Sequence, residues 1–227
     1  MRKSVQFLLL FLMCISASWT WASDAPERTV LFNMGDYDSQ YWRIPALVTA
    51  ADNSLVAVVD KRGSSLGDLP NTISIMSRRS TDNGKNWSEP VVVAQGGNGK
   101  TYGDPAVVLD KKTGNLICMF VGDQGLWNAT PYNRQGIYVS KSTDNGVSWS
   151  EPVAITDQVY ANHSGWYAGF AGSGHGLCLK DGRLMFVLAI RATSATGVPL
   201  HNYAIYSDDG GDNWAFSTKA PTTAGGE

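Results

Sequence analysis

The sequence predicts an all-β fold and, within that class, a β-propeller. Three observations support this prediction. One turn motif recurs three times at near-constant spacing, starting at Ser80, Ser142 and Ser207. Alternating strand-like segments precede each copy, and the composition is turn-rich and aromatic, with 24 glycines, 8 tryptophans and 9 tyrosines. A four-stranded sheet repeated around an axis accounts for such a pattern.

The first 22 residues are predicted to be a signal peptide. Arg2 and Lys3 precede the apolar run VQFLLLFLMCIS, and small residues follow up to Ala22. This order is typical of a secretory signal, and the apolar run is too short to span a bilayer. No later run is long enough to cross a membrane. We therefore expect cleavage near Ala22 and export of residues 23–227, either secreted or periplasmic.

Strand-like segments then organise the chain into units. The segments directly before the three motifs are TISIMSRRS, GIYVSKS and NYAIYS. Upstream of these, after a turn, lie NSLVAVVDKR, GNLICMFVG and GRLMFVLAIR, and the sequence WSEPV opens another strand after the first two motifs. Each unit is therefore predicted to be a four-stranded antiparallel meander. No segment beyond the signal has a convincing helical period.

The repeated motif has the pattern S-x-D-x-G-x-x-W, at residues 80–87, 142–149 and 207–214. Asp and Gly suit a tight turn, in which the carboxylate accepts backbone N–H bonds and Gly takes a positive φ. The tryptophan can fold back and pack under that turn. We interpret the motif as a structural staple of a hairpin, in preference to a catalytic or calcium-binding site.

Charge and cysteine content narrow the function classes. The 18 Lys+Arg and 20 Asp+Glu give a net charge of -2, which argues against a nucleic-acid-binding face. Cys118 and Cys178 lie in apolar strand-like runs, so we expect two buried free thiols, with a disulfide as the alternative. No CxxC or HxxxH pattern suggests zinc, and neither a metal nor a cofactor is predicted.

The segment Tyr41-Trp42-Arg43-Ile44-Pro45, together with the three motifs, resembles the bacterial-type sialidase (exo-α-neuraminidase) family, in which an Arg-Ile-Pro motif precedes Asp boxes, or BNR repeats. The resemblance implies a six-bladed propeller with its site at the central axis, where the innermost strands begin. Propellers close with about four to eight blades. About three are present here, so we expect the N-terminal half of a longer catalytic domain.

The resemblance also implies roles for individual residues. Arg43 matches one of three arginines that hold the substrate carboxylate, and Arg62 matches a second pocket arginine near the O4 atom of the sugar. Asp68 matches the catalytic acid/base. Asp104 matches a carboxylate that contacts the acetamido and O4 side of the sugar, and Glu227 resembles the glutamate that partners a nucleophilic tyrosine.

Structural roles remain alternatives for several candidates. Arg62 could simply pair with Asp60, and Asp68 could be a turn former. Trp127, Met119 and Phe120 are candidates for the wall of an N-acetyl pocket, because a buried methyl group favours apolar contacts. Packing inside a blade explains Met119 and Phe120 equally well.

The chemistry of a sialic acid agrees with these residues. Its anomeric carbon carries a carboxylate, which an arginine can grip with two hydrogen bonds and which would repel an Asp or Glu nucleophile. Sialidases use a tyrosine nucleophile. The predicted activity is retaining exo-α-sialidase action on sialylated glycoproteins, glycolipids and oligosaccharides, with the chain inactive by itself. The alternatives are a non-catalytic propeller that binds carbohydrate or protein, and a glycosidase for another acidic sugar.

Overall fold

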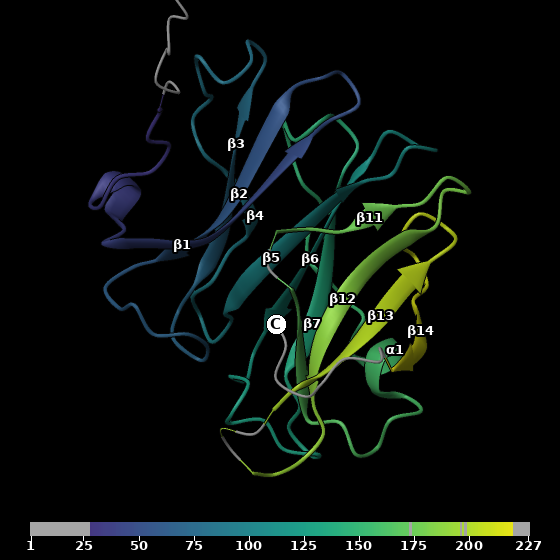
Figure 1. The fold of residues 1–227 in the computed structure, drawn as a ribbon. Coiled ribbons are helices and arrows are strands. Elements are labelled where there is room, and N and C mark those ends of the chain that lie inside the picture. Colours follow the sequence, from purple (N-terminus) through teal and green to yellow (C-terminus); the bar gives the residue numbers. More distant parts are fainter. Residues whose placement is uncertain (1–27, 173, 196, 198, 220–227) are drawn as a thin grey trace, which may run out of the picture.

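The computed structural model describes residues 28–172, 174–195, 197 and 199–219 (Figure 1). The predicted signal peptide and Glu227 lie outside the described residues. The regular secondary structure of the described part is almost all strand, as predicted, and no helix within it is long and apolar enough to cross a membrane.

The first sheet is an antiparallel meander in the order β1-β2-β3-β4. A short 3₁₀ turn, Asp36–Asp38, precedes it. Its strands are β1 (Tyr41–Thr49), β2 (Leu55–Arg62), β3 (Ser74–Ser80) and β4 (Val91–Ala94). The register places Ser80 opposite Leu55 and Tyr41 opposite Arg62. The first repeated motif and the Arg-Ile-Pro segment therefore lie at opposite ends of this sheet.

The second and third sheets are also built on antiparallel meanders, but one short strand from the third unit, β10 (Gly174–His175), pairs with the second sheet (Figure 1). The second contains β5 (Tyr102–Leu109), β6 (Leu116–Gly122), β7 (Gly136–Ser142) and β8 (Val153–Ala154). The third contains β9 (Ala168–Ala171), β11 (Leu177–Cys178), β12 (Leu184–Arg191), β13 (His201–Ser207) and β14 (Ala215–Lys219). Between β9 and β11, β10 (Gly174–His175) instead pairs parallel with β5.

Two sequence predictions need correction here. The innermost strand of the third unit is divided, because β9 and β11 both pair with β12 while β10 joins the second sheet. A helix also exists: α1 (Thr156–Tyr160) is too short for a helical period to show in the sequence, and it buries Val159 and Tyr160. The three sheets form no closed ring, and six blades stay a prediction.

The core fills the spaces between neighbouring sheets. Strand β6 is buried on both faces: Cys118 and Phe120 pack in the cluster shared with the first sheet, and Met119 packs in the cluster shared with the third. Met119 and Phe120 therefore belong to the core, so the pocket-wall alternative is wrong for both. Cys118 and Cys178 are free thiols as expected, but Cys178 is partly exposed.

All three repeated motifs form the predicted turn. In the first, the Ser80 hydroxyl donates to Asp82 (2.8 Å), and the Asn86 amide donates to the same carboxylate oxygen (2.8 Å). These hydrogen bonds, led by that of the Asn86 amide, lower the pKa of Asp82 to about 2. The Trp87 indole N–H returns to the Gly84 carbonyl (2.9 Å). The staple interpretation is therefore confirmed for this turn, and Asp209 in the third motif has the same partners.

The second and third motifs also contact the sheet before them. Gly146 packs against Val56 of β2, and Gly211 packs against Ile117 of β6. The Arg79 Nε atom donates to the Asn145 carbonyl (3.0 Å) across the same boundary as Gly146. These turns therefore form the seams between sheets, at the end away from the Arg-Ile-Pro segment.

Replacing Gly146 by alanine is expected to destabilise the protein more than the same change at Gly84. Both glycines have φ of +85°, so both variants strain the backbone. A Cβ on Gly146 would lie 2.7 Å from the Val56 side chain, whereas one on Gly84 would lie 3.7 Å from Leu55. Overpacking should add about 1–3 kcal/mol to the loss at Gly146. Equilibrium denaturation of the two variants measures the difference in their free energies of unfolding. Equal losses of stability would contradict close packing of the Gly146 turn against the first sheet.

Candidate active site

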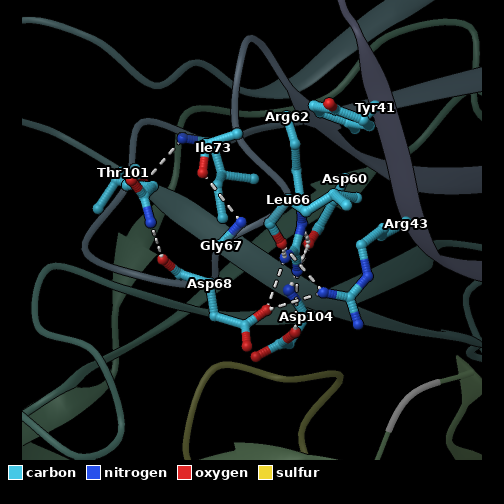
Figure 2. A network of polar contacts seen from close by, with 12 residues as sticks. Tyr41, Arg43, Asp60, Arg62, Leu66, Gly67, Asp68, Ile73, Thr101 and Asp104 are labelled. Atoms are coloured by element: carbon cyan, nitrogen blue, oxygen red, sulfur yellow. Dashed lines mark hydrogen bonds and ion pairs between the residues drawn. The ribbon is translucent and has the colours of Figure 1, made fainter. Parts of the chain in front are cut away.

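Arg43 and Arg62 meet at one end of the first sheet because their strands are antiparallel neighbours (Figure 2). Arg43 is in β1, opposite Asp60, and Arg62 is the last residue of β2. Asp68 lies in the loop that joins β2 to β3. The start of β1, the end of β2 and this loop therefore bring three of the predicted site residues together.

The first strands of the first and second sheets, β1 and β5, each contain a bulge at this end. The pairing of β1 with β2 shifts between Arg43 and Ala46, and Ile44 has a φ of 54°. The pairing of β5 with β6 shifts in the same way, and Asp104 has a φ of 57°. Positive φ is uncommon for an aspartate and strained for a β-branched isoleucine. A Pro-Ala pair follows both residues, and proline cannot donate to the strand ladder.

The Asp68 carboxylate is the exposed centre of the cluster. Its Oδ1 atom accepts hydrogen bonds from Arg62 Nη1 (2.6 Å) and Arg43 Nη1 (3.4 Å). The Leu66 carbonyl accepts from the same two nitrogens, at 2.9 Å and 3.1 Å. The Asp68 side chain is 71% exposed, whereas that of Arg62 is 1% exposed. Asp68 can therefore reach a bound molecule while its cationic partner is held in the fold.

Asp60 supports the cluster from the protein interior, where it binds the Arg62 guanidinium. Its side chain is fully buried, and Oδ2 accepts from Nε (3.1 Å) and Nη2 (2.7 Å) of Arg62. Its Oδ1 atom accepts from the Asp104 backbone amide (3.1 Å). Burial and the Asp104 carboxylate raise the pKa of Asp60 to about 7, against the opposing effect of Arg62. The alternative role for Arg62, pairing with Asp60, thus coexists with its contact to Asp68.

Asp104 brings a second carboxylate to the same place from the second sheet. Its Oδ1 atom lies 4.0 Å from Arg62 Nη2, and its side chain is 25% exposed. Burial raises its pKa, and the Arg62 guanidinium opposes that shift. The structure therefore joins four predicted site residues, Arg43, Arg62, Asp68 and Asp104, and adds Asp60. The signal for Asp60 was its alternation with Arg62, which puts both side chains on one face of β2.

Trp127 is related to the cluster through a loop contact. It lies in the turn of residues 125–129, and its side chain is 40% exposed. Gly125, at the base of this turn, is packed so closely that a Cβ would overlap the Leu69 carbonyl. Since Leu69 follows Asp68, the turn that carries Trp127 abuts the loop that carries Asp68.

The assembled site has the chemistry to bind an anionic group and to move a proton. Arg43 is a partly exposed guanidinium, able to grip a carboxylate with two hydrogen bonds. Asp68 and Asp104 are carboxyl groups within reach of the same space. An all-β repeat fold thus presents an arginine–carboxylate cluster at one end of its sheets.

Comparison with known proteins places the chain in a family. A model described as the BNR repeat-like domain matches residues 44–226, and the chain belongs to that family. Curated sialidases of Bacteroides fragilis and Micromonospora viridifaciens are each 34% identical to it, over 83% and 76% of this chain. The predicted resemblance to sialidases is therefore confirmed.

Solved structures agree with this assignment. The Hadza microbial sialidase Hz136 is 30% identical, with a TM-score of 0.74 over 82% of this chain and 39% of that one. A leech intramolecular trans-sialidase also has a TM-score of 0.74, but at 17% identity it shows the fold alone. The chain spans 37% of the length of the Bacteroides fragilis sialidase and 28% of that of Micromonospora viridifaciens.

Proposed function

We propose that the complete protein is an exported exo-α-sialidase that releases terminal α-linked sialic acids from glycoconjugates with retention of configuration. The observation that carries this proposal is the convergence of Arg43 and Arg62 on Asp68. Curated proteins of Bacteroides fragilis, Paraclostridium sordellii and Micromonospora viridifaciens that the chain resembles are named sialidases. An arginine suits the carboxylate of a sialic acid, and a nearby carboxyl group suits protonation of the glycosidic oxygen. Its partners are sialylated glycoproteins, glycolipids and oligosaccharides.

In the proposed reaction, Arg43 binds the substrate carboxylate and Asp68 acts at the glycosidic bond. Protonated Asp68 gives its proton to the leaving oxygen as the bond to the anomeric carbon breaks. A tyrosine activated by a glutamate, for which Glu227 is the candidate, attacks that carbon. The Asp68 carboxylate then takes a proton from water, and the resulting hydroxide displaces the tyrosine oxygen, which leaves the α-anomer of the free sugar.

Supporting residues complete the proposal. Arg62 and Asp104 lie where they can contact the O4 side of the sugar, and Trp127 offers an apolar face for the acetamido group. Two further carboxylate-holding arginines and the tyrosine are implied by the family, and no position of this sequence matches them. We therefore propose that residues 23–227 do not hydrolyse sialosides alone.

The test is selectivity for the substrate carboxylate. The complete protein should cleave an aryl α-sialoside and leave the corresponding aryl galactoside intact, with the α-anomer as first product by NMR.

Arg43→Lys should lower kcat/KM about 10- to 100-fold, because lysine cannot make the bidentate contact. Binding of sialoglycans without release of free sugar would contradict the proposal and favour the non-catalytic alternative.

A further inference from the structure

Arg191 occupies in the third sheet the place that Arg62 occupies in the first. It ends β12, as Arg62 ends β2. Leu184 pairs with the motif serine Ser207, as Leu55 pairs with Ser80, and the two arginines lie equally far beyond these partners. Arg191 is therefore at the same end of its sheet as the cluster around Asp68. Only 1% of it is exposed.

The partners of Arg191 differ from those of Arg62. Within the described part of the chain, no carboxylate forms an ion pair with Arg191, as Asp60 does with Arg62. Its Nη1 atom donates to the Trp127 carbonyl (3.3 Å), and its Nη2 atom donates to the Ala129 carbonyl. Burial accordingly lowers the pKa of the Arg191 guanidinium. A buried cation that is costly to desolvate is thus directed at the backbone of one turn.

Two aromatic rings enclose the same guanidinium. Its central carbon lies 5.7 Å from the centre of the Trp127 ring and 5.1 Å from that of Tyr167. The Tyr167 amide donates to the Arg191 carbonyl (2.9 Å), and the Tyr167 carbonyl accepts from the Gln135 amide (3.3 Å). Cation–π contact with both rings offsets part of the desolvation. These contacts fix Arg191 at the junction of the second and third sheets.

The turn that Arg191 contacts is tightly built. The amides of Asn128 and Ala129 both donate to the Gly125 carbonyl, at 3.0 Å each. Gly125 leaves no room for a Cβ against Leu69, the neighbour of Asp68. A continuous path of contacts therefore runs from Arg191, through residues 125–129, to the loop that carries Asp68.

We propose that Arg191 is a positioning residue of the site: its guanidinium clamps the 125–129 turn and thereby holds the Trp127 ring beside the Asp68 loop. This inference rests on the proposed function in assigning Trp127 to the substrate. Because Arg191 acts through the turn, its loss should weaken substrate binding and leave the proton-transfer step largely intact. A lysine would keep the charge but lacks the planar fork whose two Nη atoms each reach one carbonyl.

The first test needs no activity. Hydrogen exchange of the Asn128 and Ala129 amides should become about 10-fold faster in Arg191→Met, since local opening of the turn costs less. Arg183→Met is the matched control: Arg183 lies just before the other end of β12, pairs with Asp208 (2.7 Å) and stacks on Tyr206 (4.1 Å). It should leave both amides unchanged. Unchanged exchange of these two amides in Arg191→Met would overturn the clamp. If Arg191→Met does not fold, the same exchange measurement is made on Arg191→Lys, and unchanged exchange there would overturn the clamp.

The second test uses kinetics of the complete protein. Arg191→Lys should raise KM for a sialoside several-fold and change kcat by less than about two-fold. Adding Trp127→Ala to Arg191→Lys should raise KM no further than Trp127→Ala does alone. Additive effects would overturn action through Trp127. If no variant and no wild type cleaves sialosides, the proposed function fails, while the exchange result still decides the clamp.

Discussion

Replacement of Asp68 by alanine is expected to lower kcat of the complete protein for a natural sialoglycan by about 10²- to 10⁴-fold, the usual contribution of a positioned general acid. The loss should be smaller for an aryl sialoside, because its leaving group needs less protonation. Asp68 is exposed and Arg62 keeps its bonds to Asp60, so the free energy of unfolding should change little.

Asp82→Ala is the matched control for this result. Asp82 is also a loop aspartate, but it lies in the first repeated motif, at the far end of the sheet from Asp68. Its loss should lower stability by removing the turn hydrogen bonds and leave kcat unchanged. If Asp68→Ala hydrolyses both substrates at the wild-type rate, Asp68 is not the acid/base.

Replacement of Arg62 by methionine is expected to destabilise the fold by about 3–5 kcal/mol at pH 8, because the buried Asp60 loses its cation and must either keep an unpaired charge or take up a proton. The double variant Asp60→Asn/Arg62→Met should recover much of this loss, since neither buried charge remains. Equilibrium denaturation of the two single variants and the double variant gives the coupling. A double variant as unstable as the sum of the singles would contradict a buried ion pair.

The stability loss of the Arg62→Met variant should depend on pH in a defined direction. The pKa of Asp60 in the fold is raised to about 7, above its ordinary value of 3.8. Stability linked to a raised carboxyl pKa is complete below the unfolded value and is lost as pH rises through the folded value. Without Arg62 the carboxyl pKa should rise further, so the deficit of Arg62→Met should be larger at pH 8 than at pH 5.

Local patterns in the sequence predicted the turns and most of the site. The S-x-D-x-G-x-x-W spacing contains its own hydrogen-bond partners, so Asp82 and Trp87 could be placed without knowledge of the fold. Arg43, Arg62, Asp68 and Asp104 followed from the family resemblance. The fit of these residues into one cluster depends on the pairing of β1 with β2, which the predicted four-stranded antiparallel meander already indicated.

Other features depend on contacts between units and were missed for that reason. The parallel pairing of β10 with β5 joins segments from different units, and no local period signals it. The contact of Asp60 with the Asp104 amide and the contacts of Arg191 with the 125–129 turn also join different units. Arg191 did leave a trace, because the two upstream strands of the first and third units both end in arginine.

The turns that join neighbouring sheets lie far from the candidate active site, so the stability that they supply and catalysis depend on different parts of the molecule. Gly146 and Gly211 join successive sheets at the end of the molecule away from Asp68. Substitutions that tighten or loosen a seam can therefore accumulate without displacing the arginines, and each alters only the two sheets that meet there. We therefore expect changes at these turns to alter resistance to unfolding while the arrangement of Arg43, Arg62 and Asp68 is kept.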